Sequence, residues 1–546
     1  MKALPFSAVA LVCLLLGSTL ADHPPASAKK AAVLMTGMGE VHHPVSTTNP
    51  AAQQFFDQGL ALIYAFNHDE AERSFRAATE IDPKLAMAHW GIALVLGSNY
   101  NAPTTTEHLK AAVAELRIAR ELAKEATEPE RGYIEALAKR YSDDPEANPK
   151  ELALDYKKAM GDLSRRYPED LDAMTLYAES AMDLRPWKLW DAQGRPAEGT
   201  EEIVATLEAV LRRNPRHTGA NHYYIHAVEA SPHPEKGLPS ADRLGLLAPA
   251  AGHLVHMPSH IYLRTGDYDL AARQNELAIA ADRVMIEATQ AQGIYPMMYF
   301  NHNIHFLALA RTYQGRFADA RKASLELVKN VEPHTKEMPM LQSFLPTPTL
   351  VLLAFRRWDD VLAAPAPDAQ FVVPTAIWRC ARGCALTARG KVAEAEAERE
   401  AFVDRMKHVP AGTMFGSHNT ARNILSIAAR VLNARIAVAK NDRVLAIEQL
   451  RAAVAAEDAL NYIEPPDWYL PVRPSLGGVL LANGDNAEAE KVFREELDRR
   501  PRNGRALFGL WQSLRAQNNA YAAALTEQEF RAAWKDADVT LAVEDL

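Results

Sequence analysis

From about Ala51 to the end of the sequence, Ala-rich apolar runs alternate with Glu, Arg and Lys. These residue types have high helix propensities, and apolar side chains three or four positions apart lie on one face of a helix. The preceding segment, residues 22–50, contains Pro, Ala and Ser and lacks this periodicity. The pattern therefore predicts an all-α protein that begins with an irregular leader.

Large and small residues stand at fixed positions in the first helical stretch, Ala52–Leu85. Counted from Ala52, this 34-residue unit has Phe55 at position 4, Gly59 at 8, Ala71 at 20, Phe75 at 24, Ala78 at 27 and Pro83 at 32. Small residues let two helices approach closely, an aromatic side chain fills the gap to the next unit, and proline ends a helix. The stretch resembles a tetratricopeptide repeat, in which helix A, a turn and helix B form one unit.

The same pattern recurs most clearly in Gly252–Met285, Asn301–His334 and Leu470–Asn503. The resemblance implies an α/α superhelical solenoid, in which each unit buries its faces against its neighbours. The Pro-containing segment at residues 332–349 suggests a division into an N-terminal array at 51–335 and a C-terminal array at 336–546.

The first residues, Met1–Ala21, combine Lys2 with an apolar run and the ending Thr19-Leu20-Ala21. This arrangement is typical of a secretory signal peptide, so we expect a periplasmic or secreted protein. Residues 22–50 are then expected to form a loose leader. No later segment approaches 18 uninterrupted apolar residues, so we expect no stable membrane insertion after cleavage.

Charge and cysteine content restrict the function further. The net charge of −9 and the pI of about 6.1 give no support for a nucleic-acid partner, which favours a basic stripe. Cys380 and Cys384 are the two cysteines that follow the signal segment. Four positions apart on a helix, they are candidates for a soft-metal site or a disulfide, and equally for two small packing residues.

Histidine is concentrated in one part of the chain: nine of the 18 lie between His217 and His305. Several stand three or four positions apart, namely His222/His226, His256/His260, His253/His256 and His302/His305. On a helix these spacings place both rings of a pair on one face.

The resemblance places these rings in the repeat. In tetratricopeptide families, positions 2, 5 and 9 of helix A line the concave groove and contact ligands. By this register His253, His256 and His260 occupy positions 2, 5 and 9 of one unit. His302 and His305 occupy positions 2 and 5 of the next unit, while His222, His226 and Glu229 lie on the first helix of the preceding one.

Imidazole is a common ligand of Zn, Cu and non-haem Fe, and packed helices lie about 8–10 Å apart. We therefore predict a site for Cu, Zn or Fe in the groove, with Glu229 as a ligand or general base. The predicted ligands are His222, His226, His253, His256, His260, His302 and His305. Two ions, or one ion with catalytic histidines, both agree with this number, and the sequence leaves open whether the protein is an enzyme.

An alternative keeps the fold without a metal. The groove would capture a protein, a peptide or a small molecule, with the histidines as contact residues or as polar packing residues. The aromatic, Pro-rich segment Tyr462–Pro474 is predicted to fold over one end of the groove as a lid, and His418 to face the same side. The chain lacks a Gly-rich phosphate loop and the G-x-S-x-G, H-E-x-x-H and Cys-x-x-Cys-His motifs, which disfavours nucleotide and covalent-haem chemistry.

Overall fold

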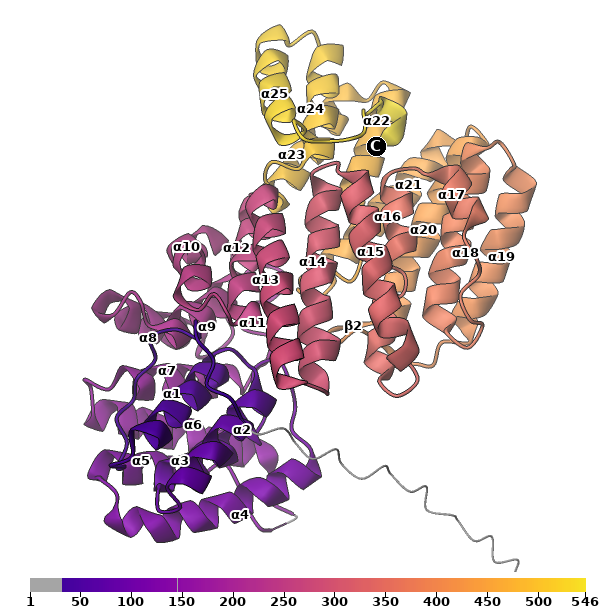
Figure 1. Cartoon of the computed structure of the whole chain (residues 1–546). Coiled ribbons are helices and arrows are strands. Elements are labelled where there is room, and N and C mark those ends of the chain that lie inside the picture. Colours follow the sequence, from indigo (N-terminus) through magenta and orange to yellow (C-terminus); the bar gives the residue numbers. More distant parts are fainter. Residues whose placement is uncertain (1–31, 145) are drawn as a thin grey trace, which may run out of the picture. The chain divides into compact units, whose positions relative to one another are not determined.

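The computed structural model describes residues 32–144 and 146–546, and Ala32–Leu546 form one compact unit. The predicted signal peptide, Met1–Ala21, lies outside these residues. Most of the described chain is helical, and consecutive helices pack side by side (Figure 1). In the two described ranges, no helix is both long and apolar enough to cross a membrane.

Many of the helices follow one another through short turns, and longer loops connect others, such as α7 and α8 or α21 and α22. The N-terminal half contains α1 (Pro50–Tyr64), α2 (His68–Ile81), α3 (Ala86–Val95), α4 (Thr106–Leu122), α5 (Glu128–Leu137), α6 (Pro149–Arg166), α7 (Leu171–Met182), α8 (Thr200–Arg213), α9 (Thr218–Val228), α10 (Leu238–Leu247), α11 (Gly252–His256), α12 (Pro258–Thr265) and α13 (Tyr268–Thr289). The C-terminal half contains α14 (Phe300–Tyr313), α15 (Phe317–Val331), α16 (Thr347–Ala354), α17 (Trp358–Ala363), α18 (Val372–Ala388), α19 (Val392–Lys407), α20 (Ala421–Ala439), α21 (Arg443–Asp458), α22 (Arg473–Asn483), α23 (Asn486–Arg499), α24 (Gly504–Ala516) and α25 (Ala520–Ala533).

Short elements complete the chain. The 3-10 helices are η1 (Ala123–Glu125), η2 (Pro234–Gly237), η4 (Glu332–His334), η5 (Pro339–Phe344) and η6 (Val543–Asp545). A π-helical turn, η3 (Tyr295–Tyr299), precedes α14. Strands β1 (Met414–Phe415) and β2 (Asn419–Thr420) pair antiparallel in a small hairpin, with Phe415 opposite Asn419.

Two of the predicted repeats pack in the same way around an aromatic ring. Phe75 lies so close to Gly59 and Gly91 that a Cβ on either glycine would stand 2.6 Å from the ring. The same arrangement recurs in the unit Leu470–Asn503, among Phe493, Gly477 and Gly509. In both cases the ring is at position 24, one glycine at position 8, and the other at position 6 of the following unit. This repeated geometry confirms the tetratricopeptide-type helix pairs and the all-α superhelical fold.

The turn from helix A to helix B uses a left-handed residue at position 15 of the unit. Gly266, Gly315 and Gly484 occupy this position with φ angles of 79°, 75° and 88°. In the first unit the same position is Phe66, with φ of 52°. The left-handed conformation costs a residue with a Cβ about 1–2 kcal/mol. Something other than the turn itself must therefore favour phenylalanine here.

Residues 32–49, the described part of the predicted loose leader, form no helix or strand but are held against the helices. The Met35 N–H donates to Gln58 Oε1 at 2.6 Å. His43 Nδ1 lies 2.9 Å from Asp172 Oδ2 on α7. The segment lacks periodicity, yet its polar groups find partners on the repeat array.

Replacing Phe75 with Ala should lower the free energy of unfolding by about 3–5 kcal/mol. The ring is fully buried, and the glycines on either side cannot fill the space it would leave. Urea denaturation followed by circular dichroism measures the change. Tyr521→Ala, at a side chain that is 78% exposed, is the control and should change stability by less than about 0.5 kcal/mol. Equal stability of the two variants would contradict the packing role of Phe75.

Candidate metal centre

Six of the seven predicted histidine ligands gather into two adjoining groups. Triad 1 consists of His222 and His226 from α9 and His253 from α11. Triad 2 consists of His256 from α11, His260 from α12 and His302 from α14. Within each triad, one ligand nitrogen per ring lies within 4.8 Å of the others. The ring centroids of His226 and His260 are 5.9 Å apart, so the triads are neighbours.

Local sequence brings these helices together. The four-residue spacing on α9 sets the ring centroids of His222 and His226 4.9 Å apart. Gly252 begins α11, where a Cβ would stand 2.0 Å from Asp282 Oδ1 on α13, so only glycine allows this approach. Pro258 begins α12 directly after α11, because proline has no N–H to continue the helix.

In triad 1, the Nδ1 atoms of two rings already form hydrogen bonds with acceptors. His222 Nδ1 lies 2.7 Å from the carbonyl oxygen of Tyr64, and His226 Nδ1 lies 2.7 Å from Glu229 Oε1. A carbonyl and an ionised carboxylate can only accept, so each ring carries its proton on Nδ1. The Nε2 atoms of both rings, and both nitrogens of His253, are buried without a partner in the described part of the chain.

In triad 2, two rings are oriented in the same way. His256 Nδ1 lies 2.7 Å from Asn275 Oδ1, and the Asn275 amide is itself oriented by its N–H bond to the Ala271 carbonyl at 2.7 Å. His260 Nδ1 lies 2.6 Å from Glu229 Oε2. With both protons on Nδ1, the Nε2 lone pairs of His256 and His260 face each other at 3.0 Å.

Glu229, the C-cap of α9, connects the two triads. One carboxylate oxygen accepts from His226 of triad 1, and the other accepts from His260 of triad 2 and from the Tyr462 hydroxyl at 3.1 Å. Burial by itself raises the pKa of Glu229, but its interaction with His260 and the hydrogen bonds from both rings hold it well below its usual value. The carboxylate therefore stays ionised, which fixes the tautomers of both rings.

Five of the six triad rings stay neutral at pH 7. Burial lowers the pKa of His222, His253, His256 and His302 well below the usual value, and the neighbouring rings lower it further. Burial also lowers the pKa of His226, although Glu229 opposes this effect. Neutral imidazole is the form that binds a metal ion.

Aromatic side chains surround triad 1. The Phe66 ring stacks on His226 and His253, with centroids 5.9 and 5.8 Å apart. Trp187 contacts His226 edge-on at 5.5 Å. Like Phe66, Trp187 has a left-handed backbone, with φ of 60°. Strained non-glycine residues cluster at functional sites, and both of these strained residues face the same triad.

Segments from the C-terminal part of the chain cover the site. Tyr462 begins the predicted lid and reaches Glu229, while His418 lies in the β1–β2 turn with its ring 5.2 Å from Trp187. Tyr462 also lines a cavity of about 450 Å³ together with Arg264 and Glu464. This cavity therefore adjoins the buried carboxylate that connects the triads.

The structure changes the predicted site in two ways. His305 is not part of either triad, because its ring stacks on Tyr469 at 5.6 Å and meets Phe344 edge-on. The sequence left open whether the groove is covered, and it is closed at this point, since His222, His226, His253, His256 and His260 are at most 2% exposed. The cause is the aromatic cover, in which Phe66 from the first repeat joins Trp187 and Tyr462 from loops outside the repeat pattern.

The sequence patterns do not indicate several residues that contact the triads. The Tyr64 carbonyl, Phe66, Asn275 and Trp187 all contact the triads, but none of them is a histidine or stands at a groove position. The signal that could have found Phe66 is its position 15, where the other clear units have glycine.

A third group, His43 with Asp170 and Asp172, also has metal-ligand spacing. Its atoms are already paired: Asp172 contacts His43, His217 and the Tyr64 hydroxyl, and Asp170 accepts from a tyrosine. This group joins the leader to the helices and leaves few free ligand atoms.

No protein-family model and no curated protein matches this chain. Solved structures that align with it include a human IFIT1 dimer with PPP-AAAA, at 14% identity and a TM-score of 0.33, over 88% of this chain and 90% of that one. Yeast Tom70 aligns at 13% identity and 0.29, over 89% and 91%, and the P58(IPK) TPR domain at 10% and 0.23, over 86% and 99%. At these values the likeness concerns the fold alone and says nothing about the site.

The metal-free protein should lose stability as the pH falls below about 6.5, the unfolded pKa of histidine. Because burial lowers the folded pKa values, the unfolded chain binds more protons, at a cost of up to about 1.4 kcal/mol per pH unit for each ring. His305, whose pKa burial lowers to about 3, contributes down to that pH. Urea denaturation at pH 7.5, 6.5 and 5.5 measures the slope.

The control for this pH dependence is a matched pair of variants. His305→Asn should reduce the slope, whereas His233→Asn, at an exposed ring, should leave it unchanged. Equal stability of the metal-free protein at pH 7.5 and 5.5 would show that the rings are not buried in neutral form.

Proposed function

We propose that this helical-repeat protein binds metal, with one ion held in each histidine triad. The observation that carries the proposal is the distance of 3.0 Å between the Nε2 atoms of His256 and His260. Both rings carry their proton on Nδ1, where it is donated to Asn275 and to Glu229. Two buried lone pairs at this distance repel each other unless a cation lies between them. Nitrogens bound to one tetrahedral Zn²⁺ at about 2.0–2.1 Å lie at a similar separation, about 3.3 Å.

The ligand set favours Zn²⁺ or copper. Each triad offers three neutral imidazoles and no thiolate, and imidazole nitrogen suits both metals. Non-haem Fe²⁺ commonly takes a carboxylate beside two histidines, but both oxygens of Glu229 are engaged by hydrogen bonds. An ion with three protein ligands keeps a position for water or another small ligand, which is the arrangement of catalytic sites.

The surrounding residues support such a centre. Glu229 orients one ring of each triad, and partners of this kind raise the basicity of the ligand and fix its tautomer. Phe66 and Trp187 cover triad 1 and exclude water from it. Tyr462 holds a hydroxyl against Glu229 at the edge of the 450 Å³ cavity, where a small substrate would approach.

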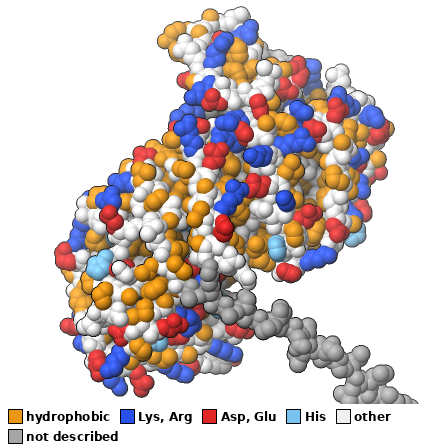
Figure 2. Space-filling view, in the orientation of Figure 1, with side chains coloured by type: hydrophobic (Ala, Val, Ile, Leu, Met, Phe, Trp, Pro, Cys, Tyr) orange, Lys and Arg blue, Asp and Glu red, His pale blue; other side chains and the backbone are white. Residues whose placement is uncertain are grey.

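The alternative, a groove that captures a partner through its histidines, has less support. Five of the six triad rings are at most 2% exposed, so a docked peptide would not touch them. On the face shown in Figure 2, Lys and Arg side chains are interspersed with Asp and Glu. Because both charge signs are mixed on this surface, it produces no strong electrostatic field of one sign that would attract a strongly charged partner.

Metal content after reconstitution tests the proposal. Untagged protein is stripped with a chelator, loaded separately with Zn²⁺, Cu²⁺ or anaerobic Fe²⁺, dialysed and analysed for metal. Wild-type protein should retain one ion per triad. His253→Ala should lose the ion of triad 1, His302→Ala that of triad 2, and the double variant both.

Two further variants distinguish ligation from packing. His305→Ala removes a half-buried ring outside the triads and should retain both ions. Glu229→Gln should weaken both sites about 10–100-fold, as expected for a residue that orients ligands. If wild-type protein retains none of the three metals, and none raises its melting temperature, the metal proposal is wrong.

We also propose that the protein is exported, on the strength of the signal-like segment Met1–Ala21. N-terminal sequencing of protein recovered from its native cells should show cleavage after Ala21. An intact Met1 would contradict this proposal.

A further inference from the structure

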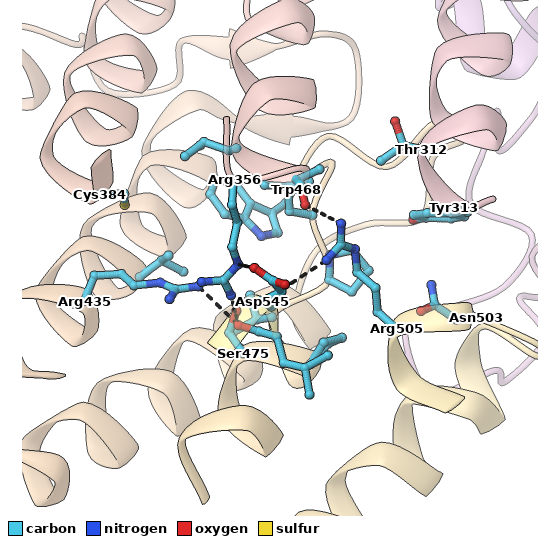
Figure 3. Close-up of a pocket in the computed structure, with 18 of the residues that line it drawn as sticks. Thr312, Tyr313, Arg356, Cys384, Arg435, Trp468, Ser475, Asn503, Arg505 and Asp545 are labelled. Atoms are coloured by element: carbon cyan, nitrogen blue, oxygen red, sulfur yellow. Dashed lines mark hydrogen bonds and ion pairs between the residues drawn. The ribbon is translucent and has the colours of Figure 1, made fainter. Parts of the chain in front are cut away.

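A second cavity, of about 100 Å³, lies among α14, α16, α18, α20, α22 and α24 (Figure 3). None of the triad histidines lines it. Its walls combine cationic, hydrogen-bonding and apolar side chains, so it differs in chemistry from the histidine centre.

Three arginines from separate parts of the chain converge on this cavity (Figure 3). Arg356 from the α16–α17 turn and Arg435 from α20 both donate to the backbone oxygen of Leu546, Arg435 at 3.3 Å. Arg505 from α24 donates to the backbone oxygen of Asp545 at 3.1 Å. Arg505 also donates to the backbone oxygen of Ala354. The acceptors are therefore main-chain oxygens, among them that of Leu546, the last residue of the sequence.

Positive charge exceeds negative charge around the cavity. Asp545 Oδ1 lies 4.0 Å from Arg356 Nε, whereas in the described part of the chain neither Arg435 nor Arg505 forms an ion pair with an aspartate or glutamate side chain. Even with a full negative charge counted at the Leu546 oxygen, three guanidinium groups face two anionic groups. Burial lowers the pKa of all three arginines, that of Arg505 to about 10, and the two neighbours lower that of Arg356 further.

Two buried donors in the same wall also lack acceptors. The Trp468 side chain is 4% exposed and that of Tyr313 is 8% exposed, and both line the cavity. In the described ranges, Trp468 Nε1 and the Tyr313 hydroxyl have no hydrogen-bond partner. A buried donor without an acceptor costs about 1–3 kcal/mol. The cavity therefore presents several donors and a deficit of acceptors.

The backbone of Arg356 is strained. Its φ is 49° at the turn between α16 and α17, where other helix pairs have Gly390, Asn441 or Asn518. Glycine and asparagine tolerate this conformation, whereas arginine rarely adopts it. The strain places a guanidinium group in the cavity, just as the strain at Phe66 places a ring over triad 1.

We propose that this cavity binds a small organic oxyanion, a carboxylate or phosphate attached to an apolar group. The arginines and the free donors of Trp468 and Tyr313 would bind the oxyanion, since guanidinium groups match carboxylate and phosphate geometry. The remaining wall, with Leu353 and Val431 among its residues, suits an apolar body.

Calorimetric titration of the full chain tests this proposal with acetate, benzoate, inorganic phosphate and phenyl phosphate. Benzoate or phenyl phosphate should bind more tightly than its small counterpart, and comparing the two identifies the preferred oxyanion. Arg435→Gln and Arg505→Gln should each weaken binding about tenfold or more, because a hydrogen bond to a charged group is lost. Arg435→Lys, which keeps the charge, should recover part of the affinity.

Two further variants serve as controls, one expected to strengthen binding and one expected to leave it unchanged. Asp545→Asn removes the competing carboxylate and should strengthen binding. Arg515→Gln, at an exposed site on the same helix as Arg505, should leave binding unchanged. Cys384 lines the cavity, so bound ligand should also slow its alkylation by iodoacetamide, as measured by mass spectrometry.

The proposal is wrong if none of the four anions binds wild-type protein at millimolar concentration. It is equally wrong if Arg515→Gln weakens binding as much as Arg435→Gln does, or if Asp545→Asn weakens it. Melting temperatures of all variants confirm that each is folded. Metal-stripped protein should give the same result because none of the triad histidines lines this cavity.

Discussion

One buried carboxylate holds the candidate centre together. Glu229 accepts a hydrogen bond from one ring of each triad. It therefore determines which nitrogen of His226 and which nitrogen of His260 carries no proton. Without it, both rings could rotate or change tautomer, and the convergence of the Nε2 atoms would be lost. The hydrogen bonds from His226 and His260 compensate for its burial and help to keep it ionised. An ion bound in one triad would therefore be coupled electrostatically to the other triad through a single residue.

The turns between helices contain the positions at which this fold needs a left-handed backbone. A tetratricopeptide-type unit needs a left-handed residue there, and glycine meets this need without strain. Two of the large side chains that stand in this conformation reach a candidate site: Phe66 above triad 1 and Arg356 in the arginine cavity. At each of these two residues, the strained backbone directs a side chain into a site that no other position of the repeat would reach.

Closure of the site depends on segments that are not part of the repeat. Trp187 belongs to the loop between α7 and α8, His418 to the small hairpin and Tyr462 to the loop after α21. Together they turn a concave helical surface into a buried pocket. A low-dielectric pocket lowers the pKa of the rings and strengthens any charge interaction within it. The solenoid thus positions the ligands, and the irregular segments set their chemistry.

The sequence by itself determined the helix pairs and the faces on which the histidines lie, because both depend on spacings within a few residues. It also identified six of the rings that converge and Glu229 beside them. Only the tertiary structure divided the rings into two triads, excluded His305 and gave Glu229 its bridging place. These outcomes depend on the rotation and stagger of neighbouring helices, which no local pattern encodes. The arginine cavity was beyond sequence analysis for the same reason, since Arg356, Arg435 and Arg505 meet only when distant helices pack.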